Sequence, residues 1–114
     1  LVLNNFTLLA EAVTLAKNAG IDPAKVPEAL KGGYADSPMF QRFFPRMIER
    51  DFNPAGYARQ VLKDLDMVID LAQQTNSPVP MSSQSTALYR VLIAKGHSEL
   101  DATAILKIYD DQTL

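Results

Sequence analysis

Apolar side chains recur at steps of three and four residues along most of this chain, and glycines and prolines separate the segments that show this spacing. The spacing predicts amphipathic helices, because an apolar stripe on a helix returns about every 3.6 residues. No run alternates between apolar and polar residues for long enough to predict a β-strand. The sequence therefore predicts an all-α fold, a bundle of five to six helices in a single domain over 1–114.

The expected helices cover most of the chain, with short polar or proline-containing stretches between them: 2–19, 23–30, 38–48, 57–74, 81–95 and 99–110. Asp22 and Ser37, each followed by a proline, are the N-cap residues expected for the second and third helices. Pro45 lies inside the third and predicts either a kink or two consecutive short helices, since proline removes a backbone donor. Ser98, with Asp101 three residues later, predicts a capping arrangement for the last helix.

The charge balance limits the class of partner. Thirteen acidic and eleven basic side chains leave a net charge of −2, and the isoelectric point is near 5.2, whereas a nucleic-acid-binding domain usually carries a basic surface. The longest apolar runs, such as 91–94, are far shorter than the roughly 20 residues of a membrane-spanning helix. We therefore expect neither a nucleic-acid partner nor a membrane partner.

The chain has no cysteine, which excludes disulfides, thiol nucleophiles and zinc–thiolate sites. The same absence fits a reducing compartment, and we expect a cytoplasmic protein. No basic segment followed by an apolar stretch opens the chain, so we expect no signal peptide. The first residue, Leu1, lies inside an apolar helical pattern, and we interpret the chain as a fragment of a longer protein.

Clusters of ionisable residues offer little evidence for a metal or a catalytic triad. His97 is the only histidine, and no spacing in the sequence indicates a nucleophile and a carboxylate that would form a catalytic triad with it. We therefore expect a structural or surface role. Asp64, Asp66 and Asp70 lie close together, but a hard cation needs several converging oxygens. We favour a solvated helix face with a contact between Lys63 and Asp66, and we expect no metal site.

Hydroxyl and glycine residues also have simple structural interpretations. The serines at 82, 83 and 85 open the helix expected over 81–95, where hydroxyls usually cap free N–H groups. The five glycines never form the Gly-x-Gly-x-x-Gly pattern of a dinucleotide-binding loop. The residues alone therefore predict a helical domain and no particular chemistry.

Several short motifs follow one another in a fixed order: Ala-Glu-Ala-Val-Thr-Leu-Ala at 10–16, Ala-Gly-Ile-Asp-Pro at 19–23, Ala-Leu-Lys-Gly-Gly at 29–33, Arg-Asp-Phe-Asn-Pro at 50–54, Leu-Lys-Asp-Leu at 62–65, Pro-Val-Pro at 78–80 and Asp-Ala-Thr-Ala at 101–104. In this order and spacing they resemble the C-terminal helical domain of the β-hydroxyacid dehydrogenases. That family includes 3-hydroxyisobutyrate dehydrogenase, tartronate semialdehyde reductase and relatives that act on L-threonate and similar sugar acids. The resemblance spans nearly all 114 residues.

The resemblance implies a two-domain enzyme, in which an N-terminal Rossmann domain binds most of the NAD or NADP and this helical domain closes over the substrate. Such enzymes transfer a hydride between the nicotinamide and a small β-hydroxy acid, and the lysine of a Lys-x-x-Asn-Asn-like motif is the general acid/base. Registered on Glu11 and Ala12, that lysine falls about six residues before Leu1. Asn4 and Asn5 lie more than a turn too late to be the motif's asparagines. The resemblance therefore implies no catalytic residue in this chain, and we expect the fragment alone to be inactive.

Three residues inherit expected roles from the resemblance. The family's Lys-Asp-Leu lysine lies near the nicotinamide half of the cofactor, so Lys63 is the expected cofactor-binding residue, a point charge against cofactor oxygens or the substrate carboxylate. Asp64 is expected on the substrate side, where it orients Lys63 or a neighbouring backbone group. Tyr57 stands six residues before Lys63, near the place where an aromatic side chain often lines the family's substrate pocket. It either lines the pocket or only packs at the start of its helix.

Two functions stay open from the sequence. The first is the C-terminal domain of an NAD(P)-dependent oxidoreductase similar to 3-hydroxyisobutyrate dehydrogenase, which we expect to be a homo-oligomer. The second is a stand-alone helical interaction or dimerisation module, for which the apolar density of 39–48 and 87–93 is the support. The choice between NAD and NADP, and among isobutyrate-, glycerate- and threonate-like substrates, depends on features that this chain does not contain.

Overall fold

The computed structural model of the chain describes residues 1–110. In chain order its elements are α1 (Val2–Asn18), the 3₁₀ turn η1 (Pro23–Lys25), α2 (Val26–Leu30), α3 (Pro38–Ile48), α4 (Ala58–Thr75), α5 (Pro80–Ala94), the 3₁₀ turn η2 (Ala102–Ile105) and α6 (Leu106–Asp110). The described part of the chain holds no β-strand, and its one isolated bridge joins Tyr57 to Asp101. The expected all-α class, with six α-helices, is confirmed.

Two of the expected helix starts are confirmed by their caps. The Asp22 carboxylate accepts the N–H of Ala24 at 3.0 Å, and the Ser37 hydroxyl accepts the N–H of Phe40 at 2.9 Å. Each bond satisfies a donor that the first turn of a helix leaves free. The end of α1 is followed by Gly20 at φ +76°, a backbone conformation that favours glycine. Local sequence chemistry therefore determines these boundaries.

Pro45 does not divide its helix into two. α3 continues past it to Ile48, and the N–H of Glu49 still donates to the Pro45 carbonyl at 3.0 Å. Phe44 and Met47, on either side, are fully buried. Packing of this apolar face therefore holds the segment in one helix despite the missing donor.

The last helix begins later than expected, and Ser98 does not cap it. The carbonyl of Leu100 accepts the N–H of Ala58 at 2.8 Å, so the segment before Asp101 pairs with the start of α4. Asp101 is the N-cap residue instead, and the turn that it caps is η2. A long-range pairing therefore displaces the local capping arrangement.

The serines near the start of α5 also do not cap it. Val79 is the N-cap residue there and provides no side-chain hydrogen bond. Ser82 accepts the side-chain amide of Asn4 at 3.1 Å, and the buried Ser85 hydroxyl lies 2.9 Å from that of Thr7. The two hydroxyls therefore join α5 to α1.

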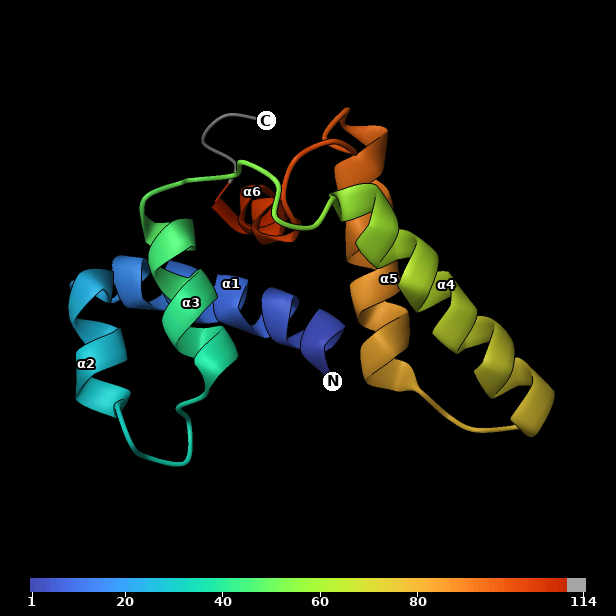
Figure 1. Cartoon of the computed structure of the whole chain (residues 1–114), viewed down its shortest axis with the longest axis horizontal. Helices are drawn as coiled ribbons and strands as arrows, with labels where there is room; N and C mark the ends of the chain where they lie inside the picture. The colour runs from blue at the N-terminus through green and yellow to red at the C-terminus, as the bar shows by residue number, and fades with distance from the viewer. Residues whose placement is uncertain (111–114) are drawn as a thin grey trace.

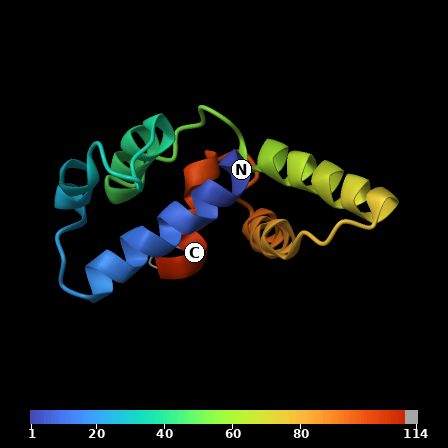
Figure 2. The ribbon, with the colours of Figure 1, turned by 90° about the horizontal axis from the view of Figure 1, so that it is seen from below.

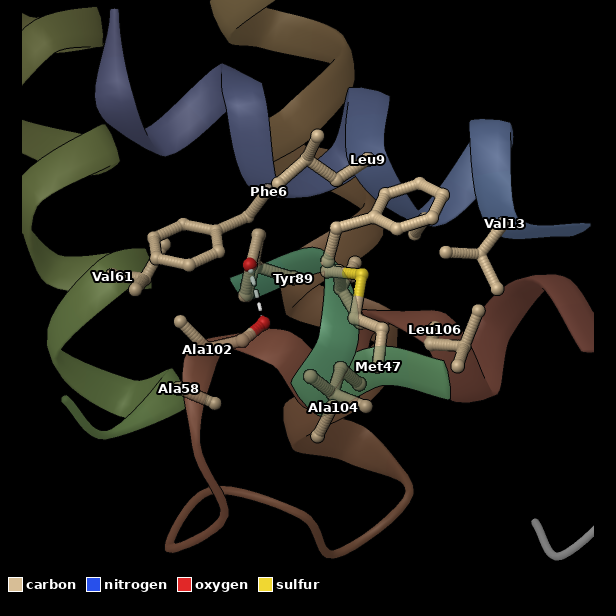
Figure 3. Packing of buried hydrophobic residues seen from close by; sticks show 14 of the residues in the cluster. Phe6, Leu9, Val13, Met47, Ala58, Val61, Tyr89, Ala102, Ala104 and Leu106 are labelled. Atoms are coloured by element: carbon tan, nitrogen blue, oxygen red, sulfur yellow. Dashed lines mark hydrogen bonds between the residues drawn. The ribbon is translucent and has the colours of Figure 1, made fainter. Parts of the chain in front are cut away.

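The elements form a core around α1 with a helical pair on one side. Figures 1 and 2 show α3 and the α6 segment lying against α1, while α4 and α5 run side by side in opposite directions away from them. In the close view of Figure 3, Phe6, Leu9 and Val13 of α1 face Met47 and Leu106. This core holds the start of α4 beside α1 and α3, where the candidate site lies.

A buried hydrogen bond connects the α5 side of the core to η2. The Tyr89 hydroxyl donates to the Ala102 carbonyl at 2.7 Å, and the Tyr89 side chain is fully buried (Figure 3). Burial is the main cause that raises the pKa of this hydroxyl well above its ordinary value, so it stays protonated as a donor.

Among residues 1–110, no helix has the length and apolar character that crossing a bilayer requires.

Candidate functional site

The Asp101 carboxylate holds the loop that precedes α4. Its Oδ1 accepts the N–H groups of Ala55 at 2.8 Å and Gly56 at 3.1 Å. Its Oδ2 accepts the N–H of Thr103 at 3.0 Å and the Thr103 hydroxyl at 2.7 Å. Arg46 Nη1 lies 3.5 Å from Oδ1, and the Asp101 side chain is only 1% exposed. One buried carboxylate therefore fixes the loop and the start of η2 together.

Asp101 is a charged structural group. Burial raises the pKa of its carboxyl, while the hydrogen bonds from Thr103, Gly56 and Ala55 lower it. The hydrogen bonds together outweigh burial, so the pKa lies below the ordinary value of 3.8 and the side chain is an anion at neutral pH. An anion with four donors already in place is suited to holding backbone rather than to proton transfer.

Backbone pairing strengthens the same junction. The N–H of Asp101 donates to the Phe52 carbonyl at 3.0 Å, and the N–H of Ala102 donates to the Gly56 carbonyl at 2.9 Å. The loop is thus attached at both of its ends before α4 begins. The first turns of α4 consequently have a fixed position relative to η2.

A groove of about 270 Å³ opens where α1, α3 and the start of α4 meet. Pockets for drug-sized ligands take about 300–1,000 Å³, so this groove suits a small organic molecule. Its lining combines apolar side chains with both signs of charge: Leu3, Phe6, Arg42, Phe43, Ala55, Gly56, Tyr57, Gln60, Val61, Asp64, Asp101 and Ala102.

A larger hollow of about 510 Å³ lies along the α4–α5 pair and is a weaker candidate. Small and apolar side chains make up most of its lining, and Arg90 is the only charged residue in it. A functional site needs several polar groups that converge on one volume. The smaller groove meets that requirement, and we take it as the candidate site.

The structure brings together two of the three residues expected at a site. Tyr57 and Asp64 both line the groove, because seven residues make about two turns of α4. The Tyr57 ring also contacts Arg59, whose guanidinium carbon lies 4.6 Å from the ring centroid. Lys63 is exposed and does not line the groove; it follows the groove residue Gln60 by one helical turn.

Three polar or charged residues of the groove were not expected from the sequence as parts of a site. Gln60 could have been predicted from the sequence, because it follows Tyr57 by three residues and therefore lies on the same face at the start of α4. Arg42 comes from α3, and no local pattern brings α3 next to the start of α4. Asp101 was expected only as part of a cap, and its contacts with Ala55 and Gly56 depend on the fold.

The expected contact between Lys63 and Asp66 is absent. Asp66 pairs instead with Arg90 of α5, at 2.6 Å between carboxylate and guanidinium, because α4 and α5 lie side by side.

Across residues 1–110 no three His, Cys, Asp or Glu side chains gather as they would around a metal ion. Burial lowers the pKa of the half-buried His97, which lies outside the groove.

The structure leaves the side chain of Lys63, the expected cofactor-binding residue, open to solvent. Its ammonium is exposed, and within the described chain it forms no ion pair or hydrogen bond. The cradle for a dinucleotide diphosphate is a glycine turn between a strand and a helix, and residues 1–110 contain no strand. No such turn is therefore present within residues 1–110, and Lys63 lies outside the lining of the groove.

Fold and groove together define an all-α domain with a groove lined by apolar side chains and by both signs of charge. Comparison with known proteins identifies the family. Residues 1–109 match the family model described as NAD-binding of NADP-dependent 3-hydroxyisobutyrate dehydrogenase, and the chain belongs to that family. The description also bears out the expected cofactor class, NAD or NADP.

Curated relatives agree with this assignment. The chain is 33% identical over 107 residues to 2-hydroxy-3-oxopropionate reductase of Escherichia coli K12, an alignment that covers 94% of this chain and 37% of the relative. It is 29% identical over 100 residues to L-threonate dehydrogenase of Cupriavidus necator, and this alignment covers 88% of this chain and 34% of that protein. The chain thus spans little more than a third of the length of these relatives.

Solved structures show the same fold. The crystal structure of 3-hydroxyisobutyrate dehydrogenase from Salmonella typhimurium superposes with a TM-score of 0.87 at 25% identity, covering 94% of this chain and 38% of that one. The Mycobacterium tuberculosis 3-hydroxyisobutyrate dehydrogenase superposes with a TM-score of 0.83 at 21% identity, covering 95% and 39%.

Proposed function

We propose that residues 1–114 are the substrate-side helical domain of an NAD(P)-dependent β-hydroxyacid dehydrogenase similar to 3-hydroxyisobutyrate dehydrogenase. The whole protein would transfer a hydride between the nicotinamide and a small β-hydroxy acid. The observation that carries the proposal is the groove at the start of α4, which Tyr57 and Asp64, the middle residue of the Lys-Asp-Leu sequence, both line.

Each groove residue has a role that its chemistry supports. The Lys63 ammonium binds an oxygen of the cofactor or of the substrate carboxylate as a point charge. Asp64 accepts a hydrogen bond from a substrate hydroxyl, and Tyr57 closes the apolar side of the groove. The bound cofactor supplies the hydride acceptor or donor. Phe6 of α1 and Val61 of α4, both buried in the lining of the groove, help to exclude water from the reacting centre.

The general acid/base is not among the residues of this groove. His97 lies outside the groove, and the Asp101 carboxylate, which lines it, already accepts four hydrogen bonds. The proposal therefore assigns proton transfer to the family lysine, which the resemblance places before Leu1. It follows that the 114-residue chain alone has no dehydrogenase activity.

Assembly and location extend the proposal. We propose a Rossmann domain as the partner of this domain within one longer chain, a homo-oligomeric enzyme, and a cytoplasmic location. On α1, Leu8 and Leu15 are 58% and 70% exposed, a feature that supports coverage of this helix by another domain or subunit. The same feature supports the second candidate, a stand-alone interaction module.

The test compares the full-length parent protein with the 114-residue chain. Each is mixed with NAD or NADP and a panel of β-hydroxy acids, and absorbance of the reduced nicotinamide is followed. We expect reduction by the full-length protein and none by the fragment. Failure of every acid with both cofactors would reject the enzyme and favour the interaction module. Turnover by the fragment would show that the general acid/base lies within these residues.

A further inference from the structure

Arg42 differs from every other arginine of the chain. The chain has five arginines, all within the described residues, and four of them lie within 4 Å of a carboxylate: Arg46 with Asp51 and Asp101, Arg50 with Asp110, Arg59 with Glu99, and Arg90 with Asp66. In the part of the chain that the structure describes, Arg42 has no ion pair and no hydrogen bond. Its guanidinium is exposed and lines the groove.

Aromatic packing keeps the Arg42 guanidinium on the α3 wall of the groove. Its central carbon lies 5.0 Å from the centroid of the Phe43 ring, a cation–π contact. The Phe43 ring in turn packs edge-on against Phe6 of α1, with 5.0 Å between ring centroids. One turn later on α3, Arg46 forms an ion pair with Asp101, a lining residue of the groove, at 3.5 Å. The first of these two arginines is therefore left for a ligand.

The remaining charges of the groove are unevenly distributed. The charge of Asp101 is compensated by its hydrogen-bond donors and by Arg46, so Asp64 on α4 is the uncompensated anion of the lining. Arg42 on α3 is the uncompensated cation. A ligand anion is attracted to the α3 wall and repelled from the α4 wall, whereas a hydroxyl can donate to Asp64. The groove thus distinguishes the two ends of a small polar molecule.

We propose that Arg42 binds a second carboxylate of the substrate, on the side of the reacting carbon opposite the first carboxylate, so that the substrate is a hydroxy dicarboxylic acid. The inference rests on the proposed function. Lys63, one helical turn after the groove residue Gln60, already offers a cation to one carboxylate or to the cofactor, and a monocarboxylic acid leaves the Arg42 guanidinium without a partner. The planar guanidinium binds a carboxylate through two parallel N–H···O bonds, a geometry that no lysine provides.

The test measures binding apart from turnover. Two ligands are matched: 3-hydroxyglutarate, and 3-hydroxyvalerate, which has a methyl group where the first has its second carboxylate. Titration calorimetry of the full-length parent protein with each acid, in the presence of NAD or NADP, gives their affinities for the wild type, Arg42→Gln and Arg42→Lys. Arg90→Gln is the control, since Arg90 is also an exposed arginine and lies outside the groove.

We expect the wild type to bind 3-hydroxyglutarate at least tenfold more tightly than 3-hydroxyvalerate. Arg42→Gln should abolish this difference by weakening the dicarboxylate alone, Arg42→Lys should restore part of it, and Arg90→Gln should leave it unchanged. The inference is overturned if the wild type binds both acids alike or neither, or if Arg42→Gln weakens both equally. A loss confined to NAD or NADP affinity would also overturn it, by assigning Arg42 to the cofactor. Cofactor reduction, assayed separately, decides the proposed function.

Discussion

Replacing Asp101 by asparagine tests whether one buried carboxylate organises the candidate site. The substitution keeps the shape of the side chain and one acceptor oxygen, but it removes the charge. The retained oxygen can still accept the N–H groups of Ala55 and Gly56. The new amide group, however, faces the N–H of Thr103, which donates to Oδ2 in the native chain. The asparagine amide and the Thr103 N–H, both donors, then face each other away from solvent.

The cost can be estimated from these contacts. A buried donor left without an acceptor costs about 1–3 kcal/mol, and we expect Asp101→Asn to lower the free energy of unfolding by ~2 kcal/mol. Asp101→Ala removes all four hydrogen bonds and leaves Arg46 without its buried partner, so we expect a loss of about 3–5 kcal/mol.

Urea unfolding of the 114-residue chain, followed by far-ultraviolet circular dichroism, measures both losses. Asp22→Asn is the matched control, because Asp22 is an exposed N-cap residue with a single hydrogen bond to Ala24. Asparagine is nearly as good an N-cap as aspartate, so the control should change stability by less than about 0.5 kcal/mol. If Asp101→Asn costs no more than the control, the carboxylate does not hold the loop and the reasoning is refuted.

Two further predictions concern the same junction. The folded-state pKa of Asp101 lies below its ordinary value of 3.8, so the ionised carboxylate stabilises the fold above that pH, and this contribution is lost as the pH falls through the folded pKa. The urea midpoint should therefore drop between neutral pH and about pH 3 more steeply in the wild type than in Asp101→Asn, and parallel profiles would contradict this. Tyr89→Phe removes the buried hydrogen bond to Ala102 and should lower the free energy of unfolding by about 1 kcal/mol. An unchanged thermal midpoint would show that this bond contributes no net stability.

The helix class and most helix starts were predictable because their causes are local. Asp22 and Ser37 cap their helices with bonds that span only a few residues. The spacing of Tyr57 and Asp64 along one helix likewise places both on a common face before any tertiary contact is known. Features of this kind depend on nearby residues and can be inferred from sequence alone.

The remaining features depend on contacts between distant segments. Ser85 meets Thr7, 78 positions away, so a residue expected to lie at a helix cap is used between two helices. Leu100 accepts the N–H of Ala58, which prevents an earlier start of the last helix. Arg42 joins the groove only because α3 packs beside α1 and the loop before α4. No local sequence pattern indicates these long-range contacts, and Arg42 was therefore not predicted as a residue of the groove.

The central claim is that the groove at the start of α4 faces a nicotinamide cofactor, and the affinity of the full-length parent protein for NADH and NADPH tests it most directly. Fluorescence titration of the wild type is compared with Lys63→Ala, and with Lys25→Ala as the control, since Lys25 is an exposed lysine of η1 outside the groove. We expect Lys63→Ala to weaken binding of the preferred cofactor about tenfold, or ~1.4 kcal/mol, and Lys25→Ala to leave it unchanged. Equal affinities for wild type and Lys63→Ala would contradict the account, because the cofactor would then not reach this edge of the groove.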